Sequence, residues 1–145
     1  MSINRRDFMQ LGMSGGIFLL MNKNLKAFNS QDFDVEEKTV LELQTALENG
    51  QVTSKQLVEI YIARIKSIDA KLNSIIEMNP DALKIAEQMD KERKNGKIRS
   101  QMHGIPVVIK DNIDTADKMK TTAGSLALVD APTPKQDAFI VQKIA

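Results

Sequence analysis

One short run of apolar residues limits what this chain can fold into. The run from Ile105 to Ile109 is rich in β-branched side chains, is too short for a helix and has its proline near the start. It therefore predicts a buried strand that ends at Lys110. The one other candidate strand is weak and covers residues 73–78. A single buried strand with so little to pair with indicates the N-terminal part of a larger α/β unit.

The rest of the sequence from residue 39 onward is patterned for helices. Thr39–Glu42 and Thr53–Gln56 are capping-box patterns, which predict helices that begin at these points. Gly50 is expected to end the first helix, and Leu72 closes the apolar stripe of the second. Asn79–Pro80 predicts the start of a third helix that runs to about residue 94, and a fourth helical pattern begins at residue 137.

Residues 1–30 differ from the remainder and are interpreted as a leader. They carry a net charge of +3, from Arg5, Arg6, Lys23 and Lys26 against Asp7, whereas residues 31–145 carry −2. The order Arg5-Arg6-Asp7-Phe8 before a glycine-rich apolar stretch resembles a twin-arginine export signal. We therefore expect the twin-arginine translocation machinery as a partner during export to the periplasm, with a cytoplasmic location as the alternative.

The leader is not expected to leave a stable membrane anchor. Its apolar stretch, residues 11–21, is too short to span about 30 Å of hydrocarbon as a helix. The chain has no cysteine, which excludes a lipoprotein anchor. Residues 31–38 are polar and acidic and are interpreted as a linker, and residues 39–145 as the first, incomplete part of a domain.

Composition excludes several classes of site. The absence of cysteine removes disulfides, thiolate zinc sites and cysteine nucleophiles, and a single histidine removes multi-histidine metal sites. No metal or organic cofactor is expected. Nucleic acid is not expected as a partner either, because the part after the leader is mildly acidic and holds only three aromatic residues.

The segments from residue 103 onward resemble the amidase signature family. The resemblance rests on His103–Thr115, which contains Gly-Ile-Pro-Val-Val-Ile-Lys-Asp-Asn, and on Thr121–Leu128 and Asp137–Val141. The preceding helices add Thr53–Val58, Tyr61–Ile65 and Leu72–Ile75. The resemblance implies that residues 39–145 supply the N-terminal helices and the first strand of that family's mixed-sheet α/β/α fold, in truncated form.

The resemblance also implies an activity. Members of the family hydrolyse or transfer amides with a nucleophilic serine, a bridging serine on a cis peptide bond and a lysine. Lys110 matches that lysine, which makes it the expected general base in the hydrolysis of non-peptide C–N bonds of small-molecule amides. Both serines lie downstream in the family, and Ser125 matches an upstream structural loop. This chain alone is therefore expected to be inactive.

Catalysis places a physical demand on Lys110. A free lysine has a pKa of about 10.4, and a base that works at neutral pH needs a pKa of about 7. Desolvation in a closed site is the means by which proteins achieve this, and the apolar run before Lys110 predicts such surroundings. Without the motif, a solvated lysine or a pair with Asp111 would be the expected arrangement.

Two other functions compete with the stand-alone amidase. The first is a subunit of the glutaminyl-tRNA amidotransferase A type, which shares the lysine motif and works with partner subunits in the cytosol. The second is a non-catalytic binding module derived from an amidase N-terminus, whose apolar helix faces would need a partner.

Overall fold

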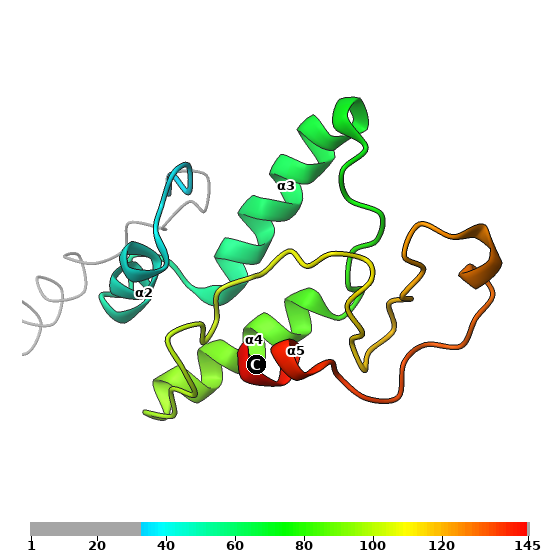
Figure 1. Cartoon of the computed structure of the whole chain (residues 1–145). Coiled ribbons are helices and arrows are strands. Elements are labelled where there is room, and N and C mark those ends of the chain that lie inside the picture. Colours follow the sequence, from blue (N-terminus) through cyan, green and yellow to red (C-terminus); the bar gives the residue numbers. More distant parts are fainter. Residues whose placement is uncertain (1–32, 145) are drawn as a thin grey trace, which may run out of the picture.

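The computed structural model describes residues 33–144, and the predicted leader lies outside this range. The regular elements of the described chain are helices, joined by long irregular segments (Figure 1). They are α2 (Val40–Glu48), α3 (Ser54–Leu72), α4 (Ala82–Lys94), the 3-10 turn η2 (Leu126–Leu128) and α5 (Phe139–Ile144). None of the helices within residues 33–144 is long and apolar enough to cross a membrane.

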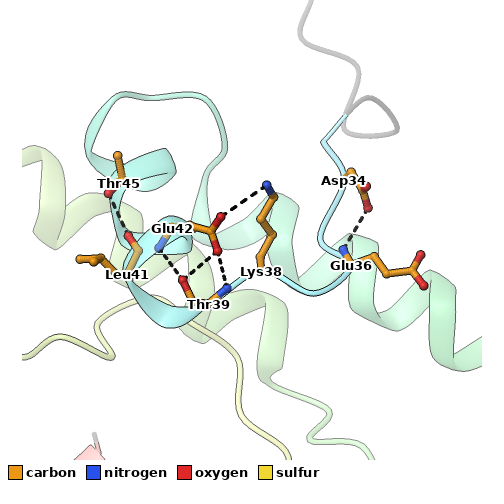
Figure 2. Close-up of polar contacts among 7 residues, drawn as sticks. All are labelled: Asp34, Glu36, Lys38, Thr39, Leu41, Glu42 and Thr45. Carbon is orange, nitrogen blue, oxygen red and sulfur yellow. Dashed lines mark hydrogen bonds and ion pairs between the residues drawn. The ribbon is translucent and has the colours of Figure 1, made fainter.

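Both predicted capping boxes are present. At the start of α2, the Thr39 hydroxyl accepts a hydrogen bond from the Glu42 amide at 3.2 Å, and the Thr39 amide donates to the Glu42 carboxylate at 2.8 Å (Figure 2). Thr53 and Gln56 make the reciprocal pair at the start of α3, with distances of 3.1 and 2.8 Å. Each box satisfies two backbone groups that a helix terminus otherwise leaves unpaired.

The ends of the helices follow local backbone geometry. Gly50, the predicted stop of α2, has a φ of +66° in the left-handed region, and Asn73 after α3 has a φ of +51°. The third helix begins at Ala82, two residues later than predicted. The Asn79 side chain accepts a hydrogen bond from the Asp81 amide at 2.8 Å, which forms a turn before the helix.

The hydrophobic core lies between α2 and the first half of α3. Leu57 is fully buried and Val52 is 1% exposed. Around them lie Val35, Leu43, Ala46 and Leu47, with Phe33, Ile60, Tyr61 and Ile105 packed against this cluster. Val35 comes from the segment that the sequence indicated as a linker, so part of that segment covers the core.

The Asp90 carboxylate on α4 caps the start of α3. The two oxygens of Asp90 accept hydrogen bonds from the backbone amides of Ser54 at 2.7 Å and Lys55 at 3.1 Å. An acidic side chain at a helix N-terminus satisfies free amides and interacts favourably with the helix dipole. Asp90, together with the ion pair between Lys55 and Glu87 at 2.8 Å, thereby joins α4 to the start of α3.

The predicted strands are not formed within residues 33–144. The segments 73–78 and 105–110 run without a β-ladder, and Val107 and Val108 are 47% and 74% exposed. The prediction of a buried strand before Lys110 is therefore wrong for the described chain. The physical reason is that a strand is held by backbone hydrogen bonds to a neighbour, and no other strand lies within the described residues to supply them.

Candidate active site

The segment that leads to the site begins with a loop at residues 101–104, which polar side chains hold in place. We call this loop and its contacts the polar anchor. The Gln44 amide nitrogen on α2 donates to the carbonyls of Gln101 at 2.7 Å and His103 at 3.1 Å. Arg93 on α4 donates to the His103 carbonyl at 2.9 Å and to the Gln44 side-chain oxygen at 2.8 Å. Two helices therefore hold one short loop by its backbone carbonyls.

Gly104 is the close-packed point of this anchor. Its φ is +83°, and its carbonyl accepts a hydrogen bond from the Ser54 hydroxyl at 2.7 Å. A β-carbon at this position would lie 3.2 Å from both Cβ and Oγ of Ser54. Glycine is therefore favoured for two reasons, its backbone conformation and the tight space beside Ser54.

His103 is buried beside this glycine. Its ring Nε2 lies 3.1 Å from the Met89 carbonyl, and the residue is 3% exposed. A nitrogen next to a carbonyl oxygen acts as the donor, so this contact assigns the proton to Nε2. The geometry gives His103 a structural role in holding α4 against the loop.

Lys110 lies at the far end of the segment that this anchor starts. The residue is exposed and lines a cavity of about 900 Å³ between α3 and the segments 74–79 and 106–124. The α3 wall is mainly apolar and includes Tyr61, Ile65, Ile68 and Leu72. The sequence predicts that Lys110 is shielded from water. In the described chain, Lys110 is instead exposed beside an apolar cavity.

Asp111 does not pair with Lys110. Its carboxylate instead accepts hydrogen bonds from the hydroxyl of Thr122, from the Thr122 amide at 3.4 Å and from the Gly124 amide at 3.3 Å. The Thr122 hydroxyl is the main cause that lowers the pKa of the Asp111 carboxyl below its usual value. No ion pair to Lys110 within 4.0 Å is found in the described part of the chain.

A second set of contacts holds the segment 114–120 beside the start of α4. The Asp117 carboxylate accepts a hydrogen bond from the side-chain Nδ2 of Asn79 at 3.1 Å, and Lys118 forms an ion pair with Asp81 at 2.6 Å. The Lys120 amide donates to the Glu77 carboxylate at 2.9 Å. These contacts join segments about forty residues apart, and Glu77, Asn79 and Lys120 among them line the cavity. Local sequence patterns did not predict these contacts.

Two serines of the described chain, Ser125 and Ser74, take part in local hydrogen bonds. Ser125, set aside as a nucleophile on sequence grounds, donates its amide to the Thr122 carbonyl at 2.8 Å and precedes η2. Ser74 lines the cavity, but its hydroxyl is hydrogen-bonded to Asp69 at the end of α3. A search of the described residues finds no cluster of His, Asp or Glu side chains suited to a metal ion.

Comparison with known proteins gives the class of this chain. The family described as Amidase matches residues 56–145, and the chain therefore belongs to the amidase family. A protein of Schizosaccharomyces pombe that is provisionally named an amidase is 44% identical over 114 residues, which cover 79% of this chain and 19% of that protein. The A subunit of the glutamyl-tRNA(Gln) amidotransferase of Renibacterium salmoninarum is 38% identical over 103 residues, which cover 70% of this chain and 19% of that protein.

The structural comparison agrees with the family. The native peptide amidase from Stenotrophomonas maltophilia matches with a TM-score of 0.70 and 42% identity, over 75% of this chain and 22% of that enzyme. The described helices therefore correspond to the N-terminal portion of the amidase-signature fold. The chain spans about a fifth of the length of the relatives it matches.

Proposed function

We propose that this chain is the N-terminal part of an amidase that hydrolyses carboxylic amide C–N bonds by serine–cis-serine–lysine chemistry, with Lys110 as the general base. The observation that carries the proposal is the place of Lys110, which follows the Gly-Ile-Pro motif and lines the cavity of about 900 Å³. The family membership supports the reaction class. The two serines would come from chain outside residues 1–145.

In the proposed reaction, Lys110 and the bridging serine move a proton in both directions. The nucleophilic serine attacks the amide carbonyl and loses its proton through the bridging serine to the neutral lysine amine. The lysine then returns that proton to the leaving nitrogen as the C–N bond breaks. Water repeats the attack on the resulting ester, which releases the carboxylic acid and restores the serine.

The exposure of Lys110 fits a site that is completed by further chain. A lysine accepts a proton only when its charged form is disfavoured, and removal of surrounding water is one way to achieve this. The apolar wall of α3 supplies one low-dielectric surface. The proposal requires the serine-bearing segment to close over the remaining side.

The proposal is tested on the complete protein that would carry both residues 1–145 and the two serines, and on residues 1–145 alone. We expect ammonia release from simple amides by the complete protein, a loss of at least about a thousandfold in kcat with Lys110→Ala, and no turnover by residues 1–145. Lys135→Ala is the matched control, because Lys135 lies away from the cavity lining. Turnover by residues 1–145 that depends on Lys110, or a Lys110→Ala protein as active as the control, would contradict the proposal.

The second candidate is an amidotransferase of the A-subunit type. The similarity to the Renibacterium salmoninarum protein favours it, although the identity is 38% against 44% for the Schizosaccharomyces pombe protein. Such a protein is expected to release ammonia from glutamine only with partner subunits. Glutaminase activity that appears on addition of those partners, without activity on simple amides, would select it.

A binding module is the third candidate. The exposure of Ile68 and Leu72 on α3, at 43% and 66%, favours it, because such an apolar surface needs a cover. A sharp cooperative unfolding transition of residues 1–145 alone would favour a module over a part of a larger domain.

Export of the protein is a proposal based on residues 1–30. It is tested with a reporter protein fused to residues 1–35, and a reporter that stays in the cytoplasm would contradict it.

A further inference from the structure

One loop of this chain is built around a single carboxylate. The Asp111 carboxylate accepts hydrogen bonds from the Thr122 hydroxyl and from the backbone amides of Thr122 and Gly124. Between them, the Ala123 amide donates to the backbone carbonyl of Asp111 at 3.0 Å. Three successive backbone amides and one hydroxyl therefore converge on one residue.

The backbone of this loop is held in an unfavourable conformation. Ala123 has a φ of +50° and Gly124 a φ of +72°, which places both in the left-handed region. This region is disfavoured for alanine because of its β-carbon, whereas glycine adopts it freely. Such a conformation persists where surrounding contacts enforce it, and here the hydrogen bonds to Asp111 do so.

The occupied amides exclude one role for the loop and indicate another. Successive amides that point to one spot can bind an anion, but here Asp111 already takes all three. The loop is thus closed to a substrate oxyanion. Ala123 and Gly124 nevertheless line the same cavity as Lys110, so the loop forms a wall of the site and not its oxyanion donor.

The same contacts fix the backbone beside Lys110. The Lys110 carbonyl accepts a hydrogen bond from the Ile113 amide at 3.0 Å, which closes a turn over residues 110–113. Asp111 lies within this turn and ties it to residues 122–124. The hydrogen bonds also direct the Asp111 carboxylate to the Thr122–Gly124 loop, and no ion pair between it and Lys110 is found within 4.0 Å in the described residues.

We propose that Asp111 is a positioning residue for Lys110, which through its hydrogen bonds to the Thr122–Gly124 loop fixes the turn that carries the lysine and the cavity wall beside it. The inference rests on the proposed base role of Lys110. Misplacement of a proton acceptor affects the chemical step more than ground-state binding. We call the hydrogen bonds that Asp111 accepts from Thr122 and Gly124 the Asp111 clamp. Loss of this clamp should therefore lower kcat with little change in KM.

The test uses the complete protein that contains residues 1–145 and two substitutions that weaken these hydrogen bonds. Asp111→Asn leaves one acceptor oxygen in place of two, and Thr122→Val removes the hydroxyl donor. We expect each to lower kcat by about tenfold or more with KM changed by less than about threefold. Hydrogen exchange of the peptide that contains residues 121–125 should become faster in both. Thr122→Ser keeps the hydroxyl and should restore kcat to within about threefold of the parent protein.

Asp130→Asn and Thr133→Val are the matched controls, since both residues are exposed and lie away from the cavity lining. If Asp111→Asn fails to fold, the Thr122 pair decides. A Thr122→Val protein with the kcat of its control, or a Thr122→Ser protein as impaired as Thr122→Val, would overturn the inference. Failure of the proposed function is separate, because it shows as an active Lys110→Ala protein whatever the clamp variants do.

Discussion

At the scale of single residues, the site depends on a glycine whose backbone conformation and close neighbours disfavour a side chain. Gly104 combines a left-handed φ with a close approach to Ser54, and it begins the segment that leads to Lys110. In the sequence this glycine is recognisable as part of a motif. The contact that explains it joins residues 50 positions apart and is visible only in three dimensions.

Gly104→Ala is expected to destabilise the protein more than Gly96→Ala. Both glycines have positive φ values, +83° and +73°, so both substitutions carry the backbone penalty of about 1–2 kcal/mol. Only the new β-carbon at residue 104 meets neighbouring atoms, whereas nothing lies within 4 Å at residue 96. Urea denaturation of the two variants measures the difference, and equal losses would show that the contact with Ser54 relaxes at no cost.

At the scale of elements, the helices are held by charges placed near their ends. Asp90 caps the start of α3 from α4, and Glu92 near the end of α4 binds Arg99 through two hydrogen bonds of 2.7 Å each. The Arg99 contact folds residues 95–99 back onto the helix. This contact lies just before the loop at residues 101–104, which α2 and α4 hold by its backbone carbonyls.

The Glu92–Arg99 pair is expected to make the protein sensitive to acid. The hydrogen bonds of Arg99, and then of Gln88, lower the pKa of Glu92 from 4.5 to about 2. A carboxyl with a depressed pKa stabilises the folded state fully above its ordinary pKa, and this stabilisation is lost as the pH falls from about 4.5 towards 2.

Thermal melts of Glu92→Gln between pH 7 and pH 2 provide the measurement. The variant should be less stable than the parent protein at pH 7, and the difference should shrink below pH 4.5. Glu48→Gln is the control, because Glu48 is exposed at the end of α2. A difference that stays constant down to pH 2 would show that the pair does not couple stability to protonation.

At the scale of the whole molecule, the apolar side chains of α3 lie in two different environments. Leu57 at its start is fully buried in the core with α2, and Leu72 at its end is 66% exposed beside the cavity. The sequence pattern predicts one continuous apolar face along this helix, which ends at Leu72. Which part of that face is covered depends on where α2 lies, and α2 covers only the first half.

Leu57→Ala and Leu72→Ala are therefore expected to differ although the chemical change is the same. The first removes packed atoms from the core and should lower the free energy of unfolding by about 2–5 kcal/mol. The second removes a mostly solvated side chain and should change it by less than about 0.5 kcal/mol. Chemical denaturation of both variants measures this, and similar losses would place Leu72 in a packed core.

Local sequence determined the parts of this protein whose contacts span a few residues. The capping boxes at Thr39 and Thr53 and the stop at Gly50 were predictable because each depends on groups within three or four positions. The lysine motif and the family were predictable for a similar reason, since the matching residues are contiguous. Lys110 as a base remains a prediction that the serine-bearing part must complete.

Only the tertiary structure decided the contacts between distant segments. Gln44 holds the His103 carbonyl across 59 positions, Asp90 caps α3 across 36, and Asp111 binds Thr122 across 11. The predicted strands failed for the same physical reason. Backbone hydrogen bonds of a strand come from a neighbour elsewhere in the chain, so an apolar β-branched run becomes a strand only where the fold places another strand beside it.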